Sequence, residues 1–140
     1  MPAHGNAEWK GDLKSGTGSF VAGDSITGDY SFKSRFEDGP GANPEQLVAA
    51  AHAACFSMAL SAGLADAGTP AESVKTDATV TLRFVDGAPT ITSIALKTVG
   101  SVPGIDEAAF KAAAQGAKEG CPVSKALAGV PEITLDASLA

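Results

Sequence analysis

Short apolar runs separated by turn residues make up the beginning of the chain. The first forty residues are rich in Gly, Ser, Thr and Asp. Their apolar or aromatic insertions lie around Trp9, Phe20, Val21, Tyr30, Phe32 and Phe36. Frequent turn residues between short runs are typical of antiparallel strands, so this part of the chain is predicted to be a strand meander.

A long stretch without charged residues follows, at residues 46–65. Asn43 suits the N-cap of a helix, Pro44 suits the first helical position, and Gln46 completes a capping box. Gly68 is placed to end the helix. Because apolar residues occupy nearly every side of this segment, we expect a long helix that is buried.

The same stretch of about 20 residues has the length that a helix needs to cross a bilayer. Its composition argues against that interpretation, because Ala, Ser, His and Gln dominate it. The flanking sequence is that of a soluble α+β domain. We therefore expect no membrane association.

Alternating and helical patterns succeed one another in the remaining half of the chain. The predicted elements are strands at 74–85 and 91–96 around a turn at Asp86-Gly87, a helix at 106–119, a short helix after Cys121 and a strand at 133–139. The element order predicts an α+β fold in which antiparallel sheets pack against the long buried central helix.

Composition and charge narrow the function. The 140 residues suit a single domain spanning 1–140, and 44% apolar with 19% charged residues is an ordinary globular composition. A net charge of −6 without a basic cluster disfavours nucleic acid and anionic membranes as partners. Residues 1–11 contain no apolar segment of a secretory signal, so a cytoplasmic protein is expected.

Two cysteines in a cytoplasmic protein are more often redox, metal-binding or inert core residues than a structural disulfide. Cys55 lies in the middle of the long helix, where a small buried hydrophobe is the default and the helix dipole gives a thiolate no help. Cys121, between Gly120 and Pro122, lies where the free N–H groups of a short helix favour a thiolate. Local sequence does not decide which cysteine attacks first.

Three other side chains are candidates for chemistry. His52 shares a helix face with Cys55 and could be a base, a metal ligand or, by default, a hydrogen-bonded core residue. Arg35 is by default a cation on a strand surface, but in a pocket it would stabilise a thiolate and bind a substrate oxygen. Glu45 is already explained as a first-turn acid of the long helix.

Two groups of motifs belong together: residues 43–47 (NPEQL) leading into 50–58 (AAHAACFSM), and residues 121–124 (CPVS). This set resembles the OsmC/Ohr family of thiol-dependent peroxidases. Residues 31–37 (SFKSRFE) and 102–106 (VPGID) are similar to the OsmC branch in particular. The resemblance extends from Trp9 to the terminal strand.

The resemblance implies an intertwined homodimer that reduces organic hydroperoxides and, more weakly, hydrogen peroxide in defence against oxidative or osmotic stress. Cys55 would attack the peroxide and Cys121 would resolve the sulfenic acid as a disulfide, with Arg35 and Glu45 completing the site. The resemblance calls for no cofactor and no metal. A dithiol reductant would regenerate the enzyme, and lipoylated proteins are the family's favoured electron donors.

Helix geometry adds a condition to this expectation. Glu45 and Cys55 are ten residues apart, or about 15 Å along a continuous helix, so they cannot meet within one chain. If Glu45 serves Cys55, it must come from the partner, which itself argues for a dimer. An apolar pocket that includes Phe56 and Met58 would favour alkyl and aryl hydroperoxides.

Two alternatives stay open at this point. One is a non-catalytic metal- or ligand-binding dimer that uses His52, Cys55 and Cys121, for which zinc would need more ligands than the chain obviously offers. The other is a structural domain with inert cysteines.

Overall fold

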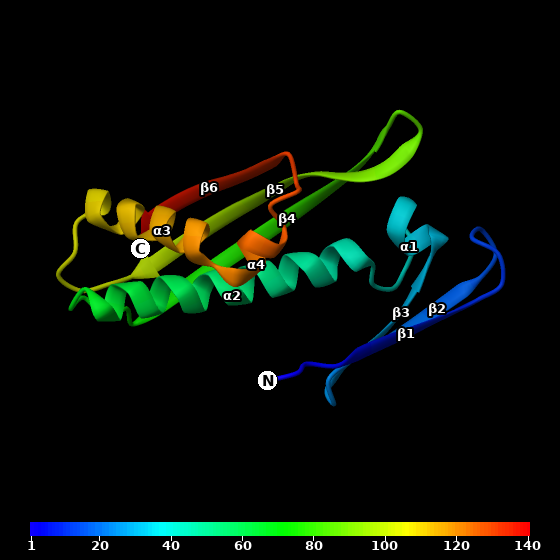
Figure 1. Cartoon of the computed structure of the whole chain (residues 1–140), viewed down its shortest axis with the longest axis horizontal. Coiled ribbons are helices and arrows are strands. Elements are labelled where there is room, and N and C mark those ends of the chain that lie inside the picture. Colours follow the sequence, from blue (N-terminus) through cyan, green and yellow to red (C-terminus); the bar gives the residue numbers. More distant parts are fainter. The chain divides into compact units, whose positions relative to one another are not determined.

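A computed structural model of the chain describes residues 1–140, which divide into two compact units, 1–46 and 47–140. The helices are α1 (Phe32–Phe36), α2 (Pro44–Asp66), α3 (Glu107–Gly120) and α4 (Pro122–Ala126) (Figure 1). The strands are β1 (Gly5–Lys10), β2 (Thr17–Ala22), β3 (Ile26–Ser31), β4 (Ser73–Val85), β5 (Ala88–Ser101) and β6 (Glu132–Leu139). This mixture of sheets and helices confirms the predicted α+β class.

The first unit contains the predicted meander, an antiparallel sheet in the order β1-β2-β3. Three aromatic rings gather on it, with the Tyr30 centroid 5.4 Å from that of Trp9 and 6.2 Å from that of Phe20. Gly18 makes room for them, since a Cβ there would lie 2.5 Å from the Tyr30 ring. Trp9, Phe20 and Tyr30, three of the apolar insertions of the sequence, are therefore packing residues of this sheet.

The helix α1 corrects the expectation that Arg35 lies on a strand. A capping box turns the chain out of β3: the Ser34 N–H donates to Ser31 Oγ at 3.1 Å, and the Ser31 N–H donates to Ser34 Oγ at 2.8 Å. Ser34 Oγ also donates to the Ala42 carbonyl at 2.7 Å. These hydrogen bonds favour one helical turn over a longer strand, and that turn carries Arg35.

The long helix α2 begins and ends where the sequence predicts. The Gln46 N–H donates to Asn43 Oδ1 at 2.9 Å, and the Asn43 N–H donates to Gln46 Oε1 at 3.1 Å. At the other end Gly68 has a φ of +82°, the left-handed conformation that favours glycine after a helix. The helix is unbroken between these caps, so Glu45 and Cys55 of one chain are too far apart along it to meet.

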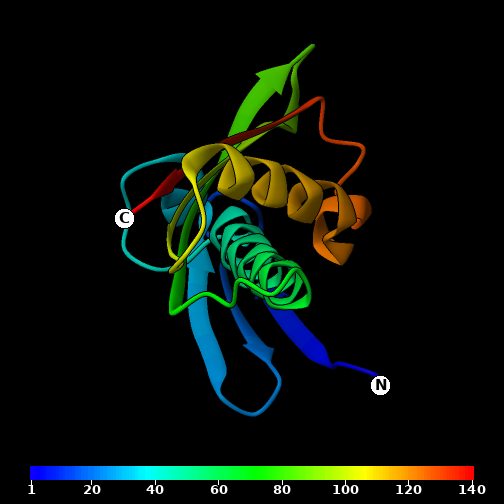
Figure 2. The same ribbon diagram turned by 90° about the vertical axis from the view of Figure 1, so that its left-hand side faces the viewer.

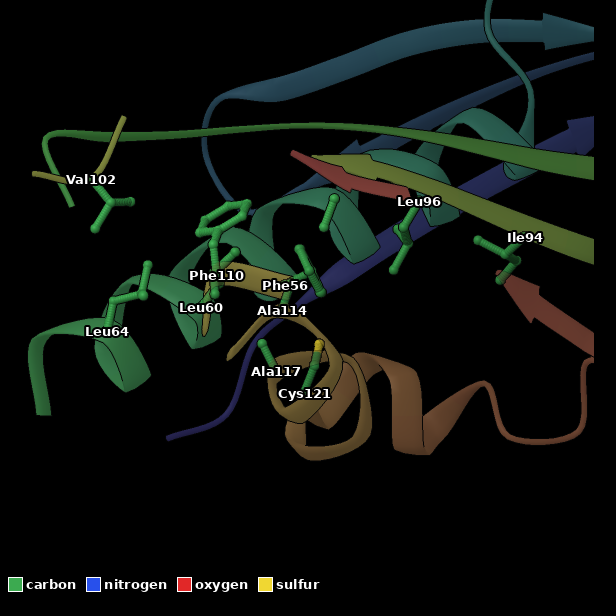
Figure 3. Packing of buried hydrophobic residues seen from close by; sticks show 11 residues of the cluster. Phe56, Leu60, Leu64, Ile94, Leu96, Val102, Phe110, Ala114, Ala117 and Cys121 are labelled. Atoms are coloured by element: carbon green, nitrogen blue, oxygen red, sulfur yellow. The ribbon is translucent and has the colours of Figure 1, made fainter. Parts of the chain in front are cut away.

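By length and composition α2 would also suit a membrane span. Its contacts are those of a core helix, because Phe56, Leu60 and Leu64 are almost completely buried. Figure 3 shows them turned toward Phe110 and Ala114 of α3. The same layer includes buried residues of β5, and Figure 2 shows α3 running beside α2 on one side of the sheet.

The second sheet has the order β4-β5-β6, and it differs from the prediction in one pairing. The β4-β5 hairpin is antiparallel, with a turn at Asp86 (φ +50°) and Gly87 (φ +80°). However, β6 runs parallel to β5. The helices α3 and α4 form the crossover connection that a parallel pair requires, so this sheet is mixed rather than antiparallel.

Only one face of α2 is buried within a single chain, which qualifies the expectation of a fully buried helix. Apolar residues on the opposite side are exposed, including Leu47 and Met58, the latter with an exposed fraction of 75%. Ala51 and Ala54 are exposed between them. These four residues follow helical spacing and form one apolar stripe on α2.

Candidate active site

The two cysteines lie next to each other although α2 carries one and the α3–α4 junction carries the other. Cys121 ends α3, with its N–H bonded to the Ala117 carbonyl at 2.8 Å, and it is the N-cap of α4. Both thiols are free, and they are within hydrogen-bonding range of each other. The tertiary structure therefore places two thiols where a disulfide could join them.

The pKa values of the two thiols move in opposite directions. Burial raises the pKa of Cys121, but hydrogen bonds from the Ser124 amide, the Cys55 thiol, the Ser124 hydroxyl and the Val123 amide outweigh it, so the net pKa is lowered. For Cys55, a hydrogen bond from the Val123 amide lowers the pKa. Burial and the hydrogen bond and charge of Cys121 raise it by more, so the net pKa is raised. Within one chain, Cys121 is therefore the thiol of the pair that ionises more readily.

Access from solvent favours the other thiol. Cys121 is completely buried, and Figure 3 shows its sulfur directed into the core. Cys55 is partly exposed. A molecule arriving from solvent can thus reach Cys55, whose thiolate form needs a positive charge beyond what its own surroundings in residues 47–140 provide.

His52 is completely buried beside this pair. Its Nε2 lies 2.7 Å from Ser124 Oγ, while its Nδ1 has no hydrogen-bond partner. Burial lowers the pKa of His52, so the imidazole is held neutral. Ser124 thus contacts both His52 and Cys121, a role that the sequence did not suggest. Its signals in the sequence were its place in the CPVS motif and its position three residues after Cys121, the N-cap of α4.

The alternative of a metal site finds no support in this geometry. No group of three or more His, Cys, Asp or Glu side chains in residues 1–140 is arranged to hold a metal ion. Of the two ring nitrogens of His52, Nε2 is hydrogen-bonded to Ser124.

In the first unit, Arg35 and Glu45 form a forked ion pair. Arg35 Nη2 lies 2.8 Å from Glu45 Oε1, and Arg35 Nε donates to both carboxylate oxygens at 3.2 and 3.3 Å. The Glu45 side chain is 9% exposed and that of Arg35 is 33% exposed. The guanidinium also lies 5.3 Å from the centroid of the Phe36 ring. Two contacts therefore fix its plane, and Nη1 is left to bind a further acceptor.

A pocket of about 430 Å³ lies against this guanidinium. It is lined by Trp9, Gly11, Leu13, Tyr30, Ser31, Phe32, Arg35 and Phe36. Arg35 is its single charged residue, so the pocket combines apolar walls with one cation. The two residues that sequence analysis assigned to a pocket lie elsewhere: Phe56 is in the core, and Met58 is on the exposed stripe of α2.

Comparison with known proteins assigns the family. The family model described as OsmC-like protein matches residues 37–136. The peroxiredoxin OsmC of Escherichia coli K12 is 49% identical over 137 residues, which cover 96% of this chain and 94% of that protein. An organic hydroperoxide resistance protein of Xanthomonas axonopodis pv. citri is 36% identical over 99 residues, covering 69% of this chain and 67% of the relative.

Solved structures agree with the fold. An organic hydroperoxide resistance protein OsmC from Legionella pneumophila has a TM-score of 0.76 at 25% identity and covers 96% of both chains. OhrB of Bacillus subtilis has a TM-score of 0.75 at 24% identity, covers 100% of this chain and 98% of its own, and supports the fold alone. With its sequence matched over nearly its whole length, this chain belongs to the OsmC-like family.

Proposed function

We propose that this protein is a thiol peroxidase that reduces organic hydroperoxides, and hydrogen peroxide more weakly, through Cys55 and Cys121. The observation that carries the proposal is the pair of free, adjacent thiols, one partly exposed and the other buried. Relatives named peroxiredoxin and organic hydroperoxide resistance protein support it.

The reaction has two steps. The Cys55 thiolate attacks the distal oxygen of the hydroperoxide, the O–O bond breaks, and the leaving alkoxide takes a proton to become an alcohol. Cys55 is then a sulfenic acid. The Cys121 sulfur attacks the Cys55 sulfur, the S–O bond breaks, and water leaves as the disulfide forms. This second step protects Cys55 from further oxidation.

Arg35 supplies the positive charge that Cys55 needs, and Glu45 orients its guanidinium. The forked ion pair supports this assignment, because it fixes the donor plane and leaves Nη1 available. Glu45 and Cys55 are ten residues apart on the unbroken helix α2, so the Arg35 and Glu45 that act on a given Cys55 come from the partner subunit.

A homodimer follows from this arrangement. The exposed apolar stripe of α2, formed by Leu47, Ala51, Ala54 and Met58, is the surface that a second copy would cover. In the dimer the 140 residues act as one peroxidase domain.

The pocket beside Arg35 accounts for a preference for organic hydroperoxides. Its aromatic walls suit an alkyl or aryl group, while the guanidinium binds the peroxide oxygens. Hydrogen peroxide has no apolar part to bury there, so it gains less binding energy.

A dithiol regenerates the reduced enzyme, and a lipoylated protein is a donor of the right chemistry. Two adjacent free thiols suit the reducing cytoplasm, where we place the protein and its role in stress defence.

The test is the thiol count and intact mass of the reduced protein before and after one equivalent of cumene hydroperoxide. Both thiols should disappear, with the mass of an intramolecular disulfide, and Cys55→Ser should abolish turnover. Unreacted thiols in metal-free protein, or full peroxidase activity in Cys55→Ser, would defeat the proposal.

A further inference from the structure

Four side chains in residues 47–140 form a continuous line of contacts that ends at the buried His52. His52 Nε2 lies 2.7 Å from Ser124 Oγ. The Ser124 hydroxyl bonds to the Cys121 sulfur, and Cys121 contacts Cys55. The line joins helix α2 to helix α4 and returns to α2. The reaction described above uses its two cysteines but leaves His52 and Ser124 without a role.

The second step of that reaction presents a proton problem. If Cys55 attacks as a thiolate, the adjacent Cys121 must be a thiol at that moment, because two neighbouring thiolates repel each other. Cys121 must then lose its proton before or while it attacks the sulfenic acid. It is completely buried, so bulk water cannot accept that proton directly. A base within the protein has to do so.

We propose that His52, acting through Ser124, takes the proton of Cys121 as this thiol attacks the sulfenic acid of Cys55. This inference rests on the proposed peroxidase function and assigns His52 and Ser124 as positioning residues for its resolving step. They touch neither the peroxide nor its alcohol product.

The step balances in atoms and electrons. The Cys121 proton passes to Ser124 Oγ as the Ser124 proton passes to His52 Nε2. The S–S bond forms and the S–O bond of the Cys55 sulfenic acid breaks. The departing hydroxide takes one proton from solvent at the partly exposed Cys55 and leaves as water. The proton held on His52 returns to Cys121 by the reverse path when the disulfide is next reduced. No external oxidant or reductant is needed.

The chemistry of His52 fits this role. A neutral imidazole can accept a proton, and burial without an ion pair keeps the ring neutral. If Nε2 accepts from Ser124, the unpartnered Nδ1 carries the hydrogen of the neutral ring. After the transfer, the Cys121–Ser124 and Ser124–His52 contacts persist with their hydrogen bonds reversed. This proton relay, from Cys121 through Ser124 to His52, therefore requires no movement of its side chains.

The surroundings of the relay contain few other titratable groups. Lys118 and Glu119 of α3 and Lys125 of α4 line a surface pocket of about 250 Å³ together with Ser124. None of them forms an ion pair with His52. The buried side chains that β5 turns toward the helices are Ile94, Leu96 and Thr98, which do not titrate. A pH effect on disulfide formation can therefore be assigned within this small set.

The experiment is a single turnover of the reduced, full-length protein with cumene hydroperoxide, quenched at intervals and analysed by mass. Dimedone traps the sulfenic acid and alkylation counts the thiols, so the two steps are timed separately across neutral pH. The variants are His52→Gln, which keeps a hydrogen-bonding group but removes the base, and Ser124→Ala. Ser57→Ala is the control, because it removes another hydroxyl contact of α2, at 2.8 Å to Thr76.

In both relay variants we expect sulfenic acid to accumulate and disulfide formation to slow by roughly 100-fold at neutral pH. The difference in the rate of disulfide formation between the variants and the wild-type protein should shrink as pH rises, because Cys121 then ionises unaided. Disulfide formation at the wild-type rate and pH profile in His52→Gln and Ser124→Ala would overturn the relay. Slowing by the same factor at every pH would also overturn it, since that indicates a structural role.

Two checks distinguish a failure of the proton relay from a failure of the proposed peroxidase function. If His52→Gln does not fold, Ser124→Ala alone decides the question. If the wild-type protein forms neither sulfenic acid nor disulfide with the peroxide, the peroxidase proposal has failed and the relay falls with it.

Discussion

Cys55 and Cys121 are in contact, and the buried Cys121 has the lowered pKa while the accessible Cys55 has the raised one. A single chain thus activates the thiol that a peroxide cannot reach. This mismatch is the physical reason for our proposal that Arg35 of the partner subunit acts on Cys55. A cation brought to Cys55 shifts the charge of the pair toward the accessible sulfur.

Replacing Cys121 should lower the pKa of Cys55. In Cys121→Ser a neutral hydroxyl replaces the thiol whose hydrogen bond and charge raise the pKa of Cys55. The alkylation rate of Cys55 by iodoacetamide should therefore stay high to lower pH than in the wild-type protein. After peroxide treatment the variant should hold a sulfenic acid that dimedone traps. A Cys55 titration shifted to higher pH would contradict the assigned coupling.

Arg35→Ala should slow the oxidation of Cys55 and raise its pKa, because the thiolate loses the cation that stabilises it. A loss of roughly 100-fold in the second-order rate constant corresponds to about 2.7 kcal/mol. Competition kinetics with a hydroperoxide, together with alkylation against pH, measures both quantities. Arg83→Ala is the matched control, since Arg83 is exposed on β4. An unchanged Cys55 pKa in Arg35→Ala would remove Arg35 from the site.

The pocket beside Arg35 should control the choice between peroxides. Leu13 lines it and is 60% exposed, so Leu13→Ser should cost little stability. We expect kcat/KM for cumene hydroperoxide to fall several-fold, since part of an apolar contact worth about 1 kcal/mol is lost. The value for hydrogen peroxide should change little. Val21→Ser, an exposed apolar residue outside the pocket, is the control; equal losses for both peroxides would argue against the pocket.

A charge on the exposed stripe of α2 should separate the subunits. Met58→Lys places an ammonium group where a second copy would bury it, which is costly for an unpaired charge. Light scattering should show monomers, and peroxide should oxidise Cys55 slowly because the partner's Arg35 is absent. A dimer of wild-type activity would place the subunit interface on another surface.

The buried His52 should make the fold sensitive to mild acid. Its pKa is lowered in the folded protein, whereas an unfolded histidine titrates at about 6.5, so the unfolded state binds more protons below that pH. The free energy of unfolding should therefore fall as pH drops below about 6.5. Denaturant melts at several pH values should show a weaker fall in His52→Gln. An equal pH dependence in both proteins would mean that His52 does not stay neutral.

Local features of this protein were determined by the sequence alone. The caps at Asn43 and Gly68 and the hairpin turn at Asp86-Gly87 lie where the residue types predict. Each depends on hydrogen bonds or backbone conformations within a few residues, so neighbouring residue types suffice to predict it. Residue chemistry and family resemblance likewise suffice to propose Cys55, Cys121, Arg35 and Glu45 as site residues.

Interactions between distant parts of the chain were decided only by the tertiary structure. The parallel pairing of β6 depends on where α3 and α4 return the chain, and no local pattern records it. The chain forms the helix α1 where a strand was expected, because the Ser34 hydroxyl also donates a hydrogen bond to the distant Ala42 carbonyl. Phe56 became a core residue because its side of α2 faces α3.

The contact between His52 and Ser124 is the clearest case of this second kind. Both residues stood in recognised motifs, yet nothing near either one in the sequence indicates that the other lies 2.7 Å away. Helical periodicity shows which residues share a face, but only packing decides which face meets which. The two cysteines could be chosen from the sequence, whereas the hydrogen-bonded line that joins them to a buried base required the folded chain.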